Sequence, residues 1–266
     1  PITVTAGETL CISGTGQMNA TLYISGGSVC NQGVINGIVD MTNGNFINNG
    51  TISSNASIMV DRGNFTNNNY IDAGNVQFNG ANIVVANNGD FYATNFQFLK
   101  NQLGSTSVFS NNGNMEVSSF MMDSSDFQNY GSLLCSGLFS NLEAASFFNY
   151  SVLEVGQNFT NKGYFYTDCM IPVGGLWANN VPGIIVGPVS GCGGFITTQS
   201  TSNFSQFGAD GSFLDMCDSS NVGSFNFNIG TIGPNVSYCN CTNLCSTAVL
   251  STPQSDFAFS IYPNPA

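Results

Sequence analysis

Apolar and polar residues alternate along this chain on both sides of a recurring polar turn. The turn is an Asn, usually followed by a second Asn and then by Gly. Its first residue is Asn31, Asn48, Asn67, Asn87, Asn111, Asn129, Asn149 and Asn161. The residue two before this Asn and the residue four after it are apolar in all eight repeats. This fixed phase predicts one small unit stacked on copies of itself, since a single unit cannot bury its apolar side alone.

Short alternating segments flank each turn and predict half-buried strands. The residues two before the turn are Val29, Phe46, Phe65, Val85, Phe109, Phe127, Phe147 and Phe159, and those four after it are Ile35, Ile52, Ile71, Phe91, Met115, Leu133, Leu153 and Phe165. A leucine-rich repeat of this length would need a Leu ladder and a helical segment, which are missing here. Hairpins of a β-sandwich would not hold two apolar columns in phase with every turn. We therefore predict an all-β fold, a right-handed parallel β-helix with about 20 residues per coil.

The corner residues suit this fold. Gly takes the third position of the turn in six of eight repeats, where a positive φ would strain a side chain. Asn tolerates left-handed backbone angles, and stacked Asn amides can hydrogen-bond from one coil to the next.

Charged residues make up only 7% of the chain, far below the share in ordinary globular domains. The basic residues are Arg62, Lys100 and Lys162, and the net charge of −12 argues against nucleic acid or an anionic membrane surface as a partner. Nowhere do eighteen apolar residues follow one another, so no membrane-spanning helix is expected. The chain opens directly on a strand-like segment, as a mature N-terminus would.

Nine cysteines indicate an oxidising compartment. We expect a disulfide between Cys11 and Cys30, a second between Cys169 and Cys192, and a third between Cys217 and one of Cys239, Cys241 or Cys245. Cys135 falls at an apolar position of its coil, which predicts a buried free thiol. Cys217 with the Cys239-x-Cys241-x₃-Cys245 segment is an alternative zinc site, although no His is present to join it.

The repeat loosens after residue 168, and Gly- and Cys-rich segments follow. We predict four regions: a β-helix with an N-terminal cap over 1–190, Cys-rich final coils and a disulfide-rich C-terminal cap over 191–250, a linker over 251–258, and a further domain that begins at 259–266. A solenoid needs a polar or cross-linked cap because its last coil otherwise leaves an open edge.

Two segments resemble known proteins. The Cys-bearing stretches at 191–195, 211–218 and 230–239 resemble those that end β-helical regions in large surface proteins of Bacteroidota. The last residues, Phe257 to Ala266, look like the opening strand of the C-terminal sorting domain recognised by the type IX secretion system. Its motif here is Ile261, Tyr262, Pro263, Asn264 and Pro265. This resemblance implies export by that machinery across the outer membrane, followed by release or attachment at the cell surface.

Two classes of function remain. The first is a non-catalytic secreted structural or adhesin-like surface protein without a cofactor, which binds surface glycans or associates with itself. The alternative is a β-helix that binds or degrades polysaccharide, for which the nearby carboxylates Asp210, Asp215 and Asp218 are the candidates.

Tyr164, Tyr166 and Trp177 are the candidate glycan contacts in either case. Tyr164 and Tyr166 flank an inward-facing Phe165, so strand alternation places both on an outer face. Carboxylates within about 10 Å of one another beside an aromatic groove would favour an enzyme.

Overall fold

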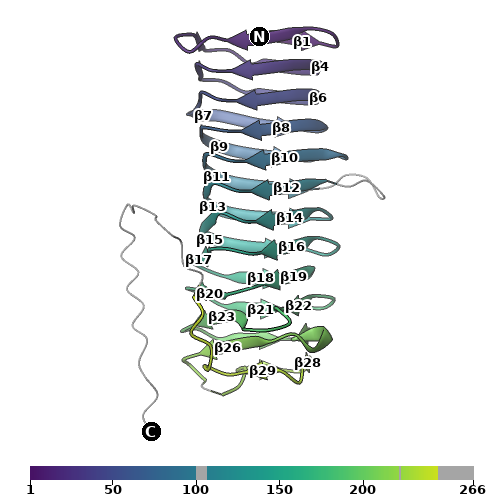
Figure 1. Ribbon diagram of the computed structural model, residues 1–266, viewed down its shortest axis with the longest axis vertical. Helices are drawn as coiled ribbons and strands as arrows, with labels where there is room; N and C mark the ends of the chain where they lie inside the picture. Colours follow the sequence, from purple (N-terminus) through teal and green to yellow (C-terminus); the bar gives the residue numbers. More distant parts are fainter. Residues whose placement is uncertain (100–106, 222, 245–266) are drawn as a thin grey trace.

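The computed structural model describes residues 1–99, 107–221 and 223–244, and these form a parallel β-solenoid of about 11 turns (Figure 1). The predicted all-β fold and the coil length of about 20 residues are confirmed. The strands pair in parallel with those of the neighbouring coils, and those of the first and last coils pair on one side only; together they build three faces that run the length of the described solenoid.

Each turn of the solenoid contributes a strand, or half of a bent strand, to the first face, then to the second and then to the third. The strands of the first seven coils are β1 (Ile2–Thr5), β2 (Thr9–Ile12), β3 (Gln17–Met18), β4 (Leu22–Asn31), β5 (Val34–Ile35), β6 (Val39–Asn48), β7 (Thr51–Val60), β8 (Gly63–Asn67), β9 (Tyr70–Phe78), β10 (Ile83–Asn87), β11 (Asp90–Leu99), β12 (Val108–Asn111), β13 (Asn114–Asp123), β14 (Asp126–Asn129) and β15 (Ser132–Asn141).

The remaining coils are built from shorter strands. They are β16 (Ser146–Asn149), β17 (Leu153–Val155), β18 (Phe159–Asn161), β19 (Tyr164–Thr167), β20 (Met170–Val173), β21 (Trp177–Asn179), β22 (Ile184–Val186), β23 (Gly193–Thr197), β24 (Thr201–Asn203), β25 (Gln206–Phe207), β26 (Leu214–Asp218), β27 (Phe227–Asn228), β28 (Thr231–Ile232) and β29 (Val236–Ser237). A single 3₁₀ turn, Ala209–Gly211, interrupts them. Within the described ranges, no helix has the length and apolar character needed to cross a membrane.

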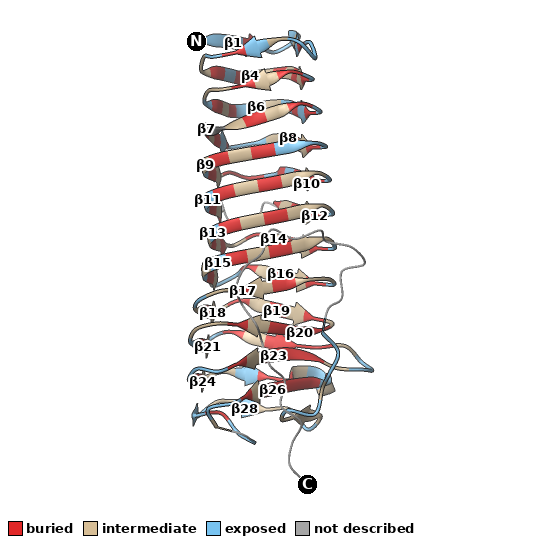
Figure 2. Ribbon diagram, turned by 90° about the vertical axis from the view of Figure 1, so that its left-hand side faces the viewer, coloured by how far each residue is buried: buried red, intermediate tan, exposed pale blue. Residues whose placement is uncertain are grey.

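Inward side chains form one apolar column behind each face, because strand register aligns equivalent residues of successive coils. Buried and less buried residues alternate along β9, β11 and β13 (Figure 2). The rings stack directly from coil to coil: Phe109 and Phe127 have centroids 4.7 Å apart, as do Phe120 and Phe139. Both predicted columns exist, behind the second and the third face. The column behind the first face, which includes Phe96, was not predicted.

The last predicted repeat is misaligned. Asn149 pairs in register with Thr167, so Thr167, and not Asn161, is the corner residue of the eighth repeat. Asn161 and Phe159 belong instead to the first face, where Phe159 lies in register with Phe139. Phe165 accordingly continues the column two residues before the turn.

Asn side chains form two hydrogen-bonded ladders at two corners, and all of them are buried except Asn228 at the end of the second ladder. In the first ladder each amide nitrogen donates to the next amide oxygen at 2.7 to 2.8 Å, through Asn31, Asn48, Asn67, Asn87, Asn111, Asn129 and Asn149. The second ladder is built in the same way at 2.7 to 2.9 Å and contains Asn141, Asn161, Asn179, Asn203 and Asn228. The coil-to-coil amide bonding predicted for the recurring Asn turn is therefore present in the first ladder, and the second ladder was not predicted.

The second ladder begins abruptly at Asn141. Its neighbour in the preceding coil is Met122, which cannot donate a hydrogen bond, and the buried Oδ1 of Asn141 has no partner. Gly113 shows why glycine is needed beside the first ladder: a Cβ there would lie 2.2 Å from the carbonyl oxygen of Gly89 one coil above.

Three disulfides staple the two ends of the described solenoid, at Cys11–Cys30, Cys217–Cys239 and Cys192–Cys241. The first agrees with the prediction, and the second selects Cys239 among the three partners considered for Cys217. The predicted Cys169–Cys192 bond is wrong, because Cys192 is bonded to Cys241; Cys169 is itself disulfide-bonded. These bonds are typical of proteins outside the cytosol. Cys135 is a buried free thiol, as predicted.

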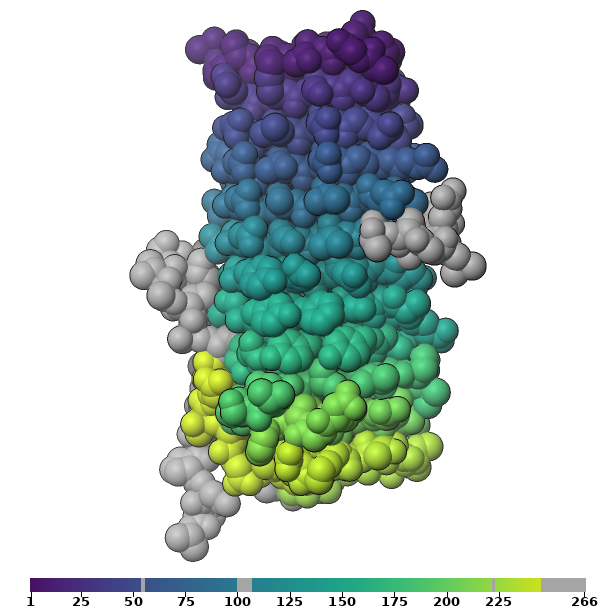
Figure 3. All heavy atoms as spheres, turned by 45° about the vertical axis from the view of Figure 1, so that its right-hand side comes forward, coloured from purple at the N-terminus to yellow at the C-terminus, as the bar shows by residue number. Residues whose placement is uncertain are grey.

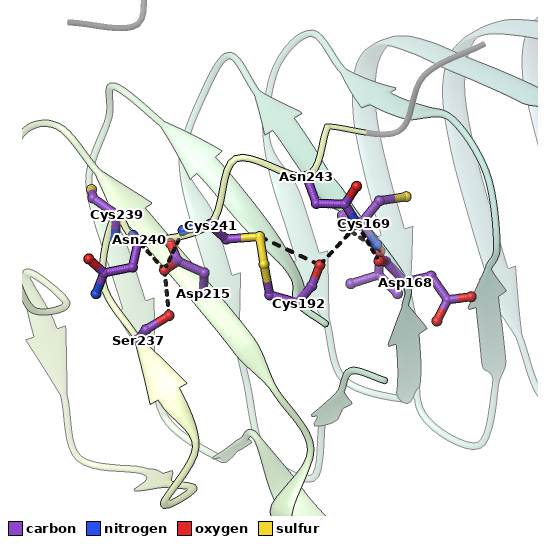
Figure 4. Close-up of a disulfide and its surroundings, with 10 residues drawn as sticks. Asp168, Cys169, Cys192, Asp215, Ser237, Cys239, Asn240, Cys241 and Asn243 are labelled. Atoms are coloured by element: carbon purple, nitrogen blue, oxygen red, sulfur yellow. Dashed lines mark hydrogen bonds between the residues drawn. A yellow bond between two sulfur atoms is a disulfide. The ribbon is translucent and has the colours of Figure 1, made fainter. Parts of the chain in front are cut away.

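Residues 239–244, here named the strap, follow the last coil and run back across three coils (Figure 4). The Cys192–Cys241 disulfide ties the strap to the coil of β23. Further along, the backbone N–H of Met170 donates to the carbonyl oxygen of Asn243 at 2.9 Å, and Leu244 forms a bridge with Met170. The strap is part of the disulfide-rich closure at the C-terminal end.

Candidate functional site

Outward-facing aromatic rings gather on the second face, over β14, β16 and β19, where two are exposed and three are partly buried. We name Tyr130, Phe148, Tyr150, Tyr164 and Tyr166 the aromatic cluster. Register places Phe148 directly beside Tyr166, and Tyr164 lies one coil below Ser146. Half of the surface of Tyr130 and 40% of that of Tyr150 are exposed. The side of the solenoid seen in Figure 3 is a nearly flat wall of stacked rows of side chains.

The rings of the cluster contact one another along the solenoid axis. Tyr130 and Tyr150 have centroids 5.0 Å apart and planes only 7° from parallel, so these two rings stack face to face and turn their edges outward. Tyr150 is tilted 47° from Tyr166, and Phe148 is tilted 46° from Tyr164. Rows of ring edges and hydroxyl groups therefore face outward from the upper part of the cluster.

Carboxylates lie at the lower edge of the cluster. The hydroxyl of Tyr166 donates to a carboxylate oxygen of Asp168. Burial, this hydrogen bond and the charge of Asp168 together raise the pKa of Tyr166. Burial is also the main cause of the raised pKa of Tyr164, with a contribution from Asp210. The hydroxyls of Tyr164 and Tyr166 thus stay protonated and act as neutral hydrogen-bonding groups.

Of the three predicted glycan contacts, Tyr164 and Tyr166 lie on the outer face as expected, and Trp177 does not. Only 1% of the Trp177 surface is exposed, because its side chain continues the inward column below Phe159, with ring planes 9° apart. Trp177 supports the core and has no access to a ligand at the surface.

A shallow hollow on the third face combines acidic and aromatic side chains. Its volume is about 250 Å³, and it is lined by Asp72, Tyr92, Ala93, Thr94, Glu116, Val117, Ser118, Leu134 and Ser136. Asp72 and Glu116 are the register neighbours of Tyr92 in the coils above and below. Burial raises the pKa of Tyr92, and the charges of Asp90 and Glu116 add to this. Several carboxylates therefore lie close together on the outer surface beside a tyrosine.

The three carboxylates considered for catalysis have structural surroundings. Asp215 is fully buried and accepts hydrogen bonds from Ser237 Oγ at 2.6 Å and from the backbone N–H groups of Cys239, Asn240 and Cys241 at 2.9, 2.8 and 3.2 Å (Figure 4). It anchors the strap.

Asp218 is buried too, and it accepts from Thr201 Oγ1 at 2.7 Å and from Ser220. Asp210 lies in the 3₁₀ turn with a φ of 58°. This segment does not present a pair of free carboxylates.

The alternative zinc site loses its ligands, because Cys217, Cys239 and Cys241 are all in disulfides. Over the described residues, no three His, Cys, Asp or Glu side chains come close enough to hold a metal ion. The predicted secretion motif, Ile261, Tyr262, Pro263, Asn264 and Pro265, lies outside the described residues, as do the predicted linker 251–258 and the predicted domain that begins at 259–266.

No protein-family model, curated protein or solved structure matches this chain, so its geometry is the guide to its function.

The sequence contained a signal for the part of the aromatic cluster that was missed. Tyr130 and Tyr150 each follow the corner Asn directly, and strand alternation turns that position outward. Phe148 lies between two inward residues and is outward by the same rule. Aligning outer positions from coil to coil, as was done for the inner ones, would have assembled the cluster.

Proposed function

We propose that this protein is a non-catalytic, secreted surface protein, exported as a cargo of the type IX secretion system, whose stapled solenoid serves as an adhesin-like or structural rod. The observation that carries the proposal is the concentration of outward-facing aromatic rings, two of them exposed and three partly buried, on one face of the solenoid. Exposed aromatic patches of this kind are typical of recognition surfaces. The core columns and the Asn ladders use the interior for stacking alone.

Several features support display outside the cell. The disulfides fit an oxidising compartment. The low content of charged side chains leaves a surface on which uncharged polar residues, Asn, Ser and Thr, predominate. The export route follows from the resemblance of the last ten residues to a sorting domain. The expected partners are the secretion machinery, surface glycans or further copies of this chain.

Display and adhesion can be tested separately. In a host with type IX secretion, the full chain should reach the cell surface, where added protease degrades it in intact cells. Replacement of Tyr262, Pro263 and Asn264 by Ala should retain it inside the cell if the motif directs export. Cells that display the protein should adhere to glycan-coated surfaces better than cells that display a Tyr130→Ser, Tyr150→Ser variant. Equal adhesion of both strains would contradict the assigned recognition face.

A polysaccharide-degrading enzyme is the second candidate, and the acidic hollow favours it. Asp72 and Glu116 flank Tyr92 there, and two carboxylates are the basic requirement of glycoside hydrolysis. Release of reducing sugar by the purified protein, lost in Asp72→Asn and Glu116→Gln variants, would establish this function. Absence of release across neutral and acidic polysaccharides would leave the non-catalytic proposal in place.

A further inference from the structure

One exposed corner of the solenoid carries a single file of polar side chains, one from each coil. We name Asn49, Asn68, Asn88, Asn112, Tyr130 and Tyr150 the corner column. Each follows the buried Asn of its own coil and is exposed. Each also donates its backbone N–H to the coil above, so the six lie in one line parallel to the axis.

The amides of the column are held in a fixed orientation. Asn68 Nδ2 donates to Asn49 Oδ1, Asn88 Nδ2 to Asn68 Oδ1 and Asn112 Nδ2 to Asn88 Oδ1, each at 2.9 Å. A carboxamide has two N–H donors and two acceptor lone pairs, and a ladder of this kind uses one of each. The other donor and lone pair of each amide remain for a ligand that lies along the column.

The two tyrosines extend the same file. Their rings stack along the axis with centroids 5.0 Å apart, and the hydroxyl of Tyr130 donates to Gln128 Oε1 at 3.3 Å. Coils of a parallel solenoid are about 4.8 Å apart, which gives the six side chains a length of about 24 Å. The distance between neighbouring coils is close to the length of one sugar unit in an extended β-linked polysaccharide.

The charge near the column selects the class of sugar. Asp168 lies at the corresponding position one coil below Tyr150, at the end of the corner column, since its backbone N–H donates to the carbonyl oxygen of Asn149. Asp90 lies two residues beyond Asn88, and the six members of the column are all uncharged. Carboxylates beside the column repel uronic acids and sulfated sugars, whereas neutral hydroxyl groups can hydrogen-bond to amides and tyrosines.

We propose that the corner column binds a neutral, extended β-linked polysaccharide that runs along the solenoid axis with one sugar unit per coil. Sugar hydroxyls hydrogen-bond to the amides of Asn68, Asn88 and Asn112, and the C–H groups of the last units contact the ring edges of Tyr130 and Tyr150. The inference rests on the proposed adhesin-like function and names its ligand.

Isothermal titration of the purified chain with cello-oligosaccharides of two to six units tests the mode of binding. Affinity should increase with each added unit up to about six, because the column has six members. Polymannuronate, an anionic β-(1→4)-linked polymer that is also extended, should not bind. Affinity that is independent of oligosaccharide length, or equal binding of polymannuronate, would overturn the proposal.

Variants locate the site. Asn88→Ala with Asn112→Ala, and Tyr130→Ser with Tyr150→Ser, should each weaken cellohexaose binding about tenfold or more, because two or more hydrogen bonds are removed. Tyr130→Phe with Tyr150→Phe keeps the rings and removes only the hydroxyls, so it should lose less.

Two matched controls lie outside the column. Asn75 and Asn95 form an exposed amide pair with the same 2.9 Å bond, and Tyr70 is an exposed tyrosine that contacts Tyr92. Asn75→Ala with Asn95→Ala, and Tyr70→Ser, should change the affinity less than about twofold, and all variants should keep the melting temperature of the parent. Equal loss in the controls would refute the location.

Failure of this inference and failure of the proposed function give different results. A protein that is displayed and adheres, but does not bind cellohexaose, retains the proposed function and loses this ligand. A protein that binds cellohexaose through the column, but is not displayed on cells, retains the ligand and loses the proposed function.

Discussion

Replacement of Asp215 by Ala tests whether this buried carboxylate holds the strap against the final coils. Asp215 accepts four hydrogen bonds, three of them from successive backbone N–H groups of the strap. Alanine removes every acceptor at once while both neighbouring disulfides stay intact. The variant therefore separates the contribution of the carboxylate from that of the covalent staples.

The magnitude follows from the four donors. A hydrogen bond to a charged group contributes about 1.5–3 kcal/mol, which sets an upper limit of about 12 kcal/mol for four. Cys239 and Asn240 are exposed residues, so water replaces the lost acceptor for part of the set. We expect about 1 kcal/mol per donor, or about 4 kcal/mol in the free energy of local opening of the strap.

Hydrogen exchange measured by mass spectrometry or NMR reports this opening directly. About 4 kcal/mol corresponds to an increase of about 10³-fold in the exchange rates of the Cys239, Asn240 and Cys241 amides. Asp215→Asn keeps one acceptor oxygen and should lie between the parent and the Ala variant. Asp126→Ala, which removes a carboxylate on the second face, serves as the control and should leave these rates unchanged. Parent-like exchange in Asp215→Ala would refute the assigned role of the carboxylate.

Three further predictions concern the core and a partly buried acid. Asn111→Ala should lower the free energy of unfolding by about 2–4 kcal/mol in chemical denaturation, because it breaks the bonds to Asn87 and Asn129, whereas the exposed Asn112→Ala should stay within about 0.5 kcal/mol of the parent. Burial raises the pKa of the Cys135 thiol to about 11, so peptide mapping should show almost no alkylation of Cys135 at neutral pH until the protein unfolds. Rapid labelling of Cys135 in the native protein would contradict this. Burial also raises the pKa of Glu154, so ionisation of this carboxyl opposes folding once the pH exceeds that pKa. Glu154→Gln should therefore be more stable than the parent near pH 7 and equally stable near pH 3. A gain in stability at both pH values would point to another cause.

Much of the fold was predictable because a solenoid repeats one local pattern in register. The apolar residues around each turn predict the strands. They also predict which residues stack on one another in adjacent coils, as Phe46 and Phe65 do. Cys11 and Cys30 lie in register on adjacent coils, so their pairing also follows from the coil length. The free thiol of Cys135 was predictable from its place in an inward column.

The failures occurred where a residue's partner or surroundings do not follow from the repeat. Cys192 is bonded to Cys241 because the strap runs back over earlier coils. The repeat pattern does not predict this reversal of the chain. The predicted surface position of Trp177 is wrong because its side chain continues the inward column behind the first face, which the residues around the recurring turn do not reveal. For the proposed recognition surface, the outward positions of Tyr164 and Tyr166 follow from strand alternation, and those of their neighbours in the aromatic cluster emerge only when outer positions are aligned from coil to coil.

The strap also determines how the molecule responds to a pulling force at its C-terminal side. Tension that enters at Leu244 meets the bridge to Met170 first and then passes from Cys241 directly into Cys192, across a sequence separation of 49. The coils between these two cysteines lie off the load path and cannot be peeled away one by one while the disulfide is intact. Reduction would release this hidden length, so the same protein is a short, stiff tether when oxidised and an extensible one when reduced.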